Sequence, residues 1–314
     1  MASAAFSPTL YYKHSGKFFW QGAVRAVLFG VAVGLPTAWV YAWFIHWDPF
    51  IYFNLLAVCL FGSIIGFVVE GVLESGKCRN APIAFLVSGL AAFLCYYFSW
   101  AVWLHAQLGF STLAFLNPDH MFAVMQTVAA HGAWSLRGST VTGAAVWATW
   151  TGEAVMVTGI AMYIATDAML ESTYCENCDQ WTKETLGAAY ISAGSASPLD
   201  ENLGYRKYQK LLKAQAVELK QHLEAKDLKY LEHLGRVEFD SVAWYQLDLH
   251  SCATCQMFHT LRVKQFQRKQ SGKKITDDTD DKEVMCQLLL TTPEADQIRG
   301  VRQEDAADVA ALDG

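Results

Sequence analysis

The chain has 314 residues, of which 53% are hydrophobic and 17% are charged, and its formal net charge is −6. An ordinary soluble domain is about a quarter charged, so this composition excludes a single soluble core. Residues 1–170 hold only 12 of the 54 Asp, Glu, Lys and Arg side chains, whereas residues 171–314 hold 18 basic and 24 acidic ones. The acidic second half excludes the basic surface that nucleic-acid binding needs. We therefore expect an α-helical membrane domain over 1–170, a hydrophilic domain over 171–302 and a flexible acidic tail over 303–314.

Four apolar segments of the first half are long enough to cross a membrane as helices, which takes about 20 residues. None of them keeps the polar stripe of a water-facing helix. The first follows several basic residues, but its apolar run is too long for a signal peptide and no small-residue cleavage site follows, so we interpret it as a retained span. The predicted spans are about 26–45, 50–73, 82–105 and 139–165.

The basic residues of the short loops predict the orientation of these spans. The arm before the first span and the loop 74–81 each carry two basic residues, whereas the loop 46–49 carries none and the connection 106–138 carries only Arg137. Because Lys and Arg gather on the cytoplasmic side, both termini are predicted to be cytoplasmic. The sequence therefore predicts a multi-pass protein of the cell inner (plasma) membrane, in contact with the lipid bilayer.

The long connection 106–138 contains a predicted short helix. Asn117 is suited to be its N-cap, Pro118 occupies the first helical position and Asp119 lies in the first turn. An apolar face that includes Phe122 and Val128 follows. We expect this helix to lie against the outer surface of the bundle or across its mouth, with a re-entrant segment as the alternative.

Three ionisable residues stand in apolar surroundings, where such groups are costly and are candidates for function. Arg25 and Glu70 lie near the cytoplasmic ends of their spans, and we expect them to form a structural pair. Glu153 lies near the middle of the fourth span, beside small residues and threonines. We favour a neutral, hydrogen-bonded carboxyl that fixes helix packing, and a proton or cation relay is the alternative.

The second half predicts an α+β domain. Apolar residues at helical spacing indicate two helices, and alternating patterns indicate three strands that follow them. A stretch of small residues at 187–199 is typical of a loop, and the polar run 270–281 predicts the connection between the last two strands. The predicted helices are 203–223 and 225–234, and the predicted strands are 241–250, 257–267 and 283–292.

Two Cys-x-x-Cys pairs, Cys175 with Cys178 and Cys252 with Cys255, are separated by 73 residues. Thiols on the cytoplasmic side are kept reduced, which argues against a disulfide framework. Four thiolates are the ligand set of tetrahedral Zn²⁺, so we predict one structural zinc site. A rubredoxin-like iron, redox dithiols, separate sites for the two pairs and the absence of metal remain as alternatives.

The pattern "YCENCDQW…SCATC" resembles the zinc-ribbon class, in which metal joins two hairpin knuckles. The resemblance covers the two knuckles and the strands around the second one, and the spacing between the pairs is longer than that of a common ribbon. It implies a structural, closed Zn²⁺ site. His250, His259 and Cys286 are not expected to be ligands, although His259 is close enough to substitute. We interpret Cys59, Cys78 and Cys95 as ordinary membrane or loop thiols.

The chain lacks a phosphate-binding loop, a Gly-x-Ser-x-Gly elbow, a His-Glu-x-x-His helix and a kinase signature. The leading hypothesis is a non-enzymatic membrane protein whose cytoplasmic zinc domain docks a protein partner or acts as a sensor; a homo-oligomer is compatible with this. The first alternative is a small ion-coupled transporter or channel that uses Glu153 and is regulated by the zinc domain. A weaker alternative is an enzyme at the outer mouth that uses Asp119, His120 and His131.

Overall fold

The structure is a computed structural model, and it describes residues 9–47, 51–109, 111–112, 117–132, 134–136, 139–193, 205–235, 237, 241–271 and 274–301. The chain forms two compact units, one of which comprises His14–Ser172. The other joins the N-terminal arm to Thr173 and the residues after it. Residues 9–13 therefore group with the second unit, although the sequence suggested a first domain that begins at residue 1. The predicted tail 303–314 lies outside the described residues.

The first unit contains four helices that are long and apolar enough to cross a membrane. Each contains most of one predicted span. The fourth prediction was wrong at its start, because residues 139–141 form strand β2 rather than helix. Ser139–Val141 pairs with β1 (Trp134–Leu136) in a short antiparallel hairpin, and the β-branched Thr140 and Val141 suit a strand. The helices are α1 (Trp20–Trp47), α2 (Ile51–Ser75), α3 (Ala81–Leu108) and α5 (Ala144–Glu171).

The helices of this unit pack through small residues and expose large apolar ones. The buried stripe of α1 consists mainly of Gly and Ala, whereas Leu28, Phe29 and Val40 on the same helix are more than half exposed. A Cβ added to Gly62 would lie 2.7 Å from the backbone oxygen of Val157, so α2 and α5 approach closely there. Small residues at helix contacts and large apolar ones outside are typical of helices packed in lipid.

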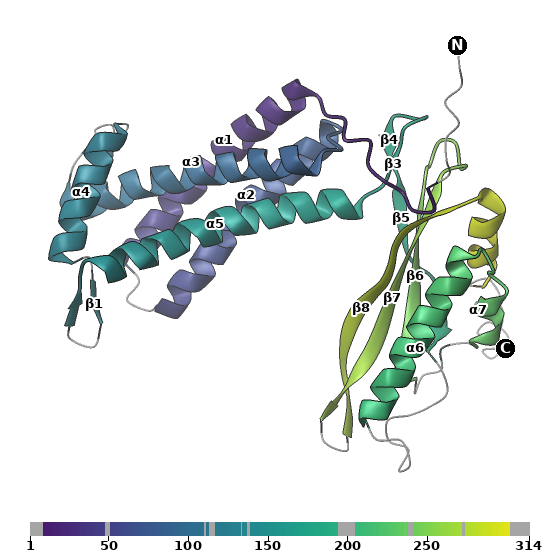
Figure 1. The fold of residues 1–314 in the computed structure, drawn as a ribbon. Coiled ribbons are helices and arrows are strands. Elements are labelled where there is room, and N and C mark those ends of the chain that lie inside the picture. Colours follow the sequence, from purple (N-terminus) through teal and green to yellow (C-terminus); the bar gives the residue numbers. More distant parts are fainter. Residues whose placement is uncertain are drawn as a thin grey trace, which may run out of the picture. The chain divides into compact units, whose positions relative to one another are not determined.

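A shorter helix, α4 (Pro118–His131), lies near the end of α3 and the start of α5 (Figure 1). Its predicted start is confirmed, because the side chain of Asn117 accepts the N–H of Asp119. The buried side chains are Met121 and Ala129. Ala129 belongs to the predicted face, whereas Phe122 of that face is 53% exposed and contacts the Trp147 ring at 5.6 Å.

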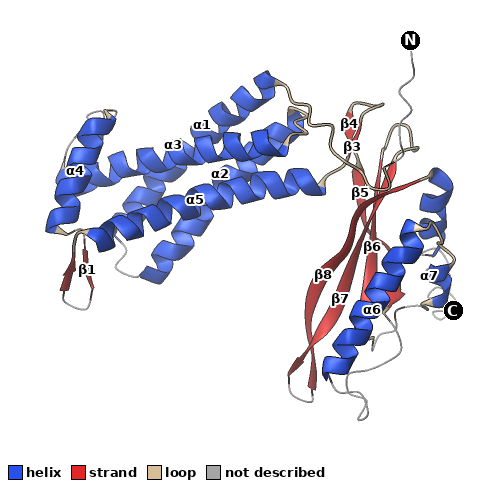
Figure 2. Ribbon diagram, viewed as in Figure 1, coloured by secondary structure: helices blue, strands red, loops and turns tan. Residues whose placement is uncertain are grey.

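The second unit is a four-stranded antiparallel sheet with helices, shown by secondary structure in Figure 2. Its strand order follows the chain, β5-β6-β7-β8. A small hairpin of β3 (Tyr174–Cys175) and β4 (Gln180–Trp181) precedes it. Backbone hydrogen bonds from Tyr12 to Gln287 and from Leu289 to Leu10 join the N-terminal arm to β8. The other elements are β5 (Lys183–Ser192), α6 (Tyr205–Glu224), α7 (Tyr230–His233), β6 (Ala243–Ser251), β7 (His259–Ser271), β8 (Lys274–Leu290) and a helix at 292–301.

Three predictions about this unit were wrong. The loop predicted from residue 187 is strand β5 as far as Ser192, because a register shift at the left-handed Gly187 hides the alternation of the strand. Residues 274–281 are strand rather than connection, since β8 pairs with β7 from Lys274 onward. The predicted helix 225–234 shrinks to Tyr230–His233, because Lys226 has a φ of 62° and ends the preceding helix.

One face of the sheet carries the core of this unit. In Figure 1, α6 runs along the sheet, and its residues Leu212, Leu219 and Leu223 are buried in one cluster with Leu247 and Val263 of the strands. Ala295 and Ile298 of the helix 292–301 complete that cluster. The sheet thus has an apolar core of its own, larger than a lone zinc ribbon would bury.

Candidate metal centre

The four cysteines of the two predicted pairs come together in one cluster. Their ligand atoms all lie within 4.8 Å of one another, and the sulfurs of Cys175 and Cys255 are 3.9 Å apart. Four sulfurs at about 2.3 Å from one tetrahedral ion lie about 3.8 Å from each other. The donor set and its spacing therefore fit one metal ion held by both pairs, not two separate sites. Cys286, Cys59, Cys78 and Cys95 do not belong to the cluster.

Each pair sits on a hairpin turn of the same form. Cys175 ends β3 and Cys178 lies in the turn before β4, while Cys252 and Cys255 lie between β6 and β7. The residue after the second cysteine is left-handed in both turns, with φ of 52° at Asp179 and 51° at Gln256. Such a turn aims two side chains and several backbone N–H groups toward one point. The two knuckles therefore present their sulfurs alike, although their sequences differ.

The first knuckle is fixed to the sheet and to the N-terminal arm. The N–H of Tyr174 donates to the Tyr12 hydroxyl at 3.2 Å, and the Tyr174 hydroxyl donates to Asp179. The hydroxyls of Thr173 and Thr260 lie 3.4 Å apart in the interior, which connects the hairpin to the start of β7. Tyr174 is fully buried. This hairpin is thus positioned by contacts outside the thiols.

The second knuckle is held by His259, which is fully buried. One ring nitrogen, Nε2, lies 2.8 Å from the carbonyl oxygen of Gln256. The other, Nδ1, lies 2.8 Å from the Ser251 hydroxyl, which also accepts from the Arg299 guanidinium at 2.9 Å. Both ring nitrogens are therefore engaged, and His259 braces the turn in place of binding metal. His250, in turn, faces Glu184 at 3.4 Å.

The surroundings of the sulfurs favour one negative charge at Cys252. Burial opposes ionisation there, but the backbone N–H of Cys255, the Gln180 amide and the backbone N–H of Thr254 lower the pKa of the Cys252 thiol to about 6. The Gln180 amide nitrogen lies 3.1 Å from that sulfur. Burial raises the pKa of Cys175 and, together with hydrogen bonds to the neighbouring thiols, that of Cys178 to about 12. Four clustered thiolates therefore need a cation to neutralise them.

Some of these supporting residues had no distinct signal in the sequence. Gln180 and Tyr12 act on the cluster through the fold, and Tyr12 lies 162 residues before Tyr174. Asp179, directly after Cys178, has a left-handed backbone. The position after the second cysteine of each pair was therefore the one clue to these turns in the sequence.

The polar residues of the helices stand apart from this cluster. Arg25 is exposed and Glu70 is half-buried, and no ion pair joins these two described residues, so the structure does not form the expected pair. Glu70 instead interacts electrostatically with Glu74, one turn further along α2. Glu153 is half-buried on α5, and its carboxylate oxygen lies 3.4 Å from the Tyr96 hydroxyl.

The structure does not bring together in one site the three residues of the weaker enzyme hypothesis. Asp119 and His120 are exposed at the start of α4, and His131 is exposed at its end. The His131 ring binds the carbonyl oxygen of Thr127 at 2.9 Å. An α-helix of this length separates its ends by about 18 Å, at 1.5 Å per residue.

Comparison with known proteins gives no relative: no family model, no curated protein and no solved structure matches this chain.

Proposed function

We propose that this chain is an integral membrane protein whose hydrophilic domain holds one structural Zn²⁺ and serves to dock a protein partner or to sense its surroundings. The observation that carries the proposal is the convergence of Cys175, Cys178, Cys252 and Cys255 within 4.8 Å. A closed set of four thiolates leaves no open position for substrate, which favours a structural ion and a protein without catalytic activity. Soft thiolate ligands favour zinc over hard cations.

Insertion into the membrane is supported by the four apolar helices and by their inverted burial pattern, with Gly and Ala inside and Leu and Phe outside. Basic residues in the arm and in the loop 74–81 favour the cytoplasmic side for these segments and for both termini. The cell inner (plasma) membrane fits this arrangement.

Docking is supported by apolar side chains that the sheet unit leaves exposed. Leu186 and Tyr190 on β5 are 63% and 45% exposed, and Met257 beside the second knuckle is 76% exposed. Tyr and Met are enriched in protein interfaces. The strand β5 is paired on one side only, with β6, so it offers backbone groups along its other edge.

The proposal is tested by metal analysis of the full chain purified in detergent under reducing conditions, together with identification of proteins that copurify. About one zinc per chain, lost in a Cys252→Ser variant and kept in Cys286→Ser, is the expected result. Iron in place of zinc would point to a rubredoxin-like centre, and a chain without metal would overturn the proposal. A partner lost in Leu186→Asp and kept in Val217→Asp, an exposed position on α6, would locate docking on β5.

A second candidate, ion-coupled transport, is favoured by one observation. Glu153 is half-buried, three residues after the buried Trp150 and four before the buried Val157 on α5, and it reaches Tyr96 on α3. Proton-driven flux in proteoliposomes, absent in Glu153→Gln, would favour this function over a purely structural carboxyl.

A further inference from the structure

Glu153 belongs to a buried polar cluster to which three helices contribute. The Tyr96 hydroxyl of α3 lies 3.4 Å from the Glu153 carboxylate of α5 and 3.0 Å from the backbone oxygen of Trp150. Tyr41 of α1 also interacts electrostatically with Glu153 and Tyr96. Its ring stacks on Phe61 of α2 at 4.8 Å. Polar groups of α1, α3 and α5 thus gather around one carboxyl group, and α2 packs against the Tyr41 ring.

The hydroxyl of Tyr41 is the unexplained feature of this cluster. Tyr41 is 7% exposed, and within the described part of the chain its buried hydroxyl has no hydrogen-bond partner. A buried donor left unpaired costs about 1–3 kcal/mol. The Tyr96 hydroxyl, with its single proton, already has the closer acceptor in Trp150. A water molecule that accepts from the Tyr41 hydroxyl and donates to the Glu153 carboxylate would remove this cost.

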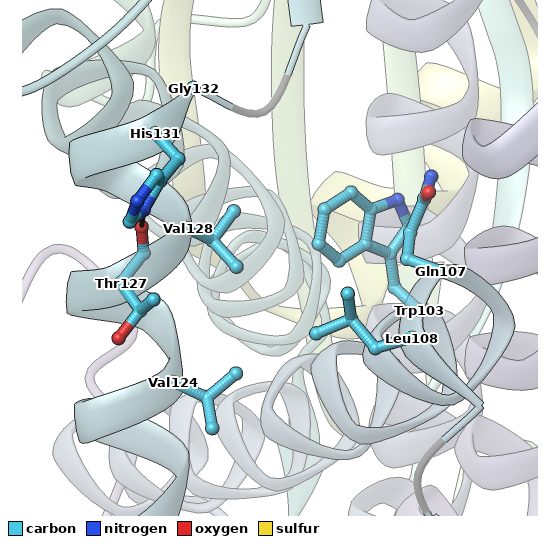
Figure 3. A pocket seen from close by; sticks show the side chains of 8 residues that line it. All are labelled: Trp103, Gln107, Leu108, Val124, Thr127, Val128, His131 and Gly132. Carbon is cyan, nitrogen blue, oxygen red and sulfur yellow. Dashed lines mark hydrogen bonds between the residues drawn. The ribbon is translucent and has the colours of Figure 1, made fainter.

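A pocket lies between the end of α3 and α4. Figure 3 shows Trp103 and Leu108 of α3 pointing toward Val124 and Val128 of α4 across a space of about 420 Å³. Gln107 and Thr127 are among the other residues that line it. His131 lines the opposite wall. The pocket is therefore mainly apolar, with a few polar groups at its margin.

A row of aromatic side chains joins this pocket to Glu153. Trp103 lines the pocket and packs against Trp100 at 5.4 Å. Trp100 contacts Trp150 at 4.5 Å, and the backbone oxygen of Trp150 accepts from Tyr96. Trp103 follows Tyr96 by seven residues on α3, about 10 Å along the helix axis. The carboxyl group is thus within two helical turns of the pocket.

We propose that Glu153, with the hydroxyls of Tyr41 and Tyr96, is a reversible proton-binding site that exchanges protons with the pocket between α3 and α4. A proton adds to one carboxylate oxygen of Glu153 and leaves it as the hydronium ion of a water molecule, and nothing is oxidised or reduced. The Tyr41 hydroxyl donates to the carboxylate when the proton is absent, directly or through one water molecule. The inference deepens the transport candidate and does not depend on the metal site.

A proton fits this cluster better than a larger cation does. The ionisable groups that face Glu153 are Tyr41 from α1 and Tyr96 from α3, while α2 contributes the Phe61 ring. In the described chain no Lys, Arg, His or second carboxyl group contributes to the electrostatics of Glu153. A divalent ion would lack compensating charge there.

The test is infrared difference spectroscopy of the full chain in lipid nanodiscs while the pH is stepped. A protonated carboxyl band should disappear as the pH rises and return as it falls, and it should be missing from Glu153→Gln at every pH. Glu153→Asp, which keeps the carboxyl group, should shift the band and retain its response to pH. Tyr41→Phe and Tyr96→Phe should each move the midpoint, while Tyr163→Phe, on the exposed face of α5, should leave it in place.

The route is tested by filling the pocket. Val128→Trp should slow the band's response after a pH jump severalfold without moving its midpoint, whereas Ala130→Trp, at an exposed position of α4 that does not line the pocket, should leave the rate unchanged. A carboxyl band of Glu153 that does not change with pH would overturn the proposed site. A midpoint pH that stays the same in both tyrosine variants would also overturn it. An unchanged rate in Val128→Trp would overturn the route. Flux is measured separately, so proton binding without flux would refute the transport function alone.

Discussion

The two units bury opposite kinds of residue. In the helical unit the interior of α1 is lined mainly by Gly and Ala, and Leu and Phe side chains face outward. In the sheet unit Leu residues of α6 and the strands fill the interior. The helices are held by close backbone approach, which suits surroundings as apolar as the side chains themselves. The sheet is held by the exclusion of apolar surface from water, with the thiol cluster at one end.

The difference teaches where each unit is vulnerable. We expect a single methyl group at a close helix contact to destabilise the first unit, and the loss of one thiolate to release the metal of the second. The cysteine cluster lies at the knuckle end, where the small hairpin β3–β4 has few apolar residues to hold it. Substitutions at the thiol cluster of the sheet unit and at a close contact of the helical unit test this comparison.

The largest effect is expected from the loss of one cysteine. Cys175→Ser and Cys252→Ser should each reduce bound zinc from about one per chain to about zero, because the site is shared and zinc binding contributes roughly 10–16 kcal/mol in small zinc-finger peptides. Limited proteolysis should then cut the hairpin around residues 176–182 in both variants. The strands β6–β8 should stay resistant, because α6 and the helix 292–301 bury their own core.

Cys286→Ser is the matched control, since this half-buried thiol on β8 lies outside the cluster. If Cys175→Ser kept its zinc while Cys252→Ser lost it, the two pairs would not share one ion. If β6–β8 became as sensitive as the hairpin, the metal and not the apolar core would hold the sheet.

The second-largest effect is expected from acid, which should release the metal. The ligand is the thiolate, so protons compete with zinc and the occupied site is favoured at high pH. The most acidic thiol of the metal-free cluster, Cys252, has a pKa of about 6, and the pKa values of Cys175 and Cys178 are raised. Zinc must displace protons from the thiols with raised pKa values throughout the neutral range, and from Cys252 as well below about pH 6. The apparent affinity, measured by competition with a chelator, should therefore fall more than tenfold for each unit of pH across the neutral range and more steeply below about pH 6. An affinity that does not change between about pH 7.5 and about pH 5.5 would contradict thiolate ligation.

Much of the helical unit and the candidate metal site followed from the sequence for identifiable reasons. A run of about 20 apolar residues has few alternatives to a spanning helix, and the four cysteines are a compact chemical signal. The predictions that were wrong concerned segments whose pairing partners are distant in the chain. Strand β5 was missed because its small residues "GAA" resemble a loop, and the pairing of Ala189 with Leu247 of β6 exists only in the fold. The N-terminal arm joins β8 across more than 270 residues, which local patterns do not reveal.

In the helical unit, Gly62→Ala should lower the free energy of unfolding in detergent by about 1–3 kcal/mol, the usual cost of overpacking. The added Cβ would meet the Val157 oxygen at 2.7 Å, and a backbone atom cannot rotate away. Gly71→Ala on the same helix is the control, because its Cβ would meet nothing within 4 Å and Ala is the better helix former by about 1 kcal/mol. Equal stability of the two variants would show that α2 and α5 are not held by close approach at this point.

The smallest effect concerns the brace of the second knuckle. Arg299 donates to the Ser251 hydroxyl at 2.9 Å, which in turn fixes the neutral His259 ring against Gln256. Arg299→Ala should weaken zinc retention by only a few-fold, since the guanidinium is exposed and one hydrogen bond contributes about 0.5–1.5 kcal/mol at most. Lys269→Ala is the control, because Lys269 pairs with Asp280 in the β7–β8 ribbon, away from the thiols in sequence. Zinc release to a chelator is the measurement. Release that is faster in Arg299→Ala than in Lys269→Ala would show that the His259 brace reaches the metal, and equal rates would confine its role to the fold of the turn.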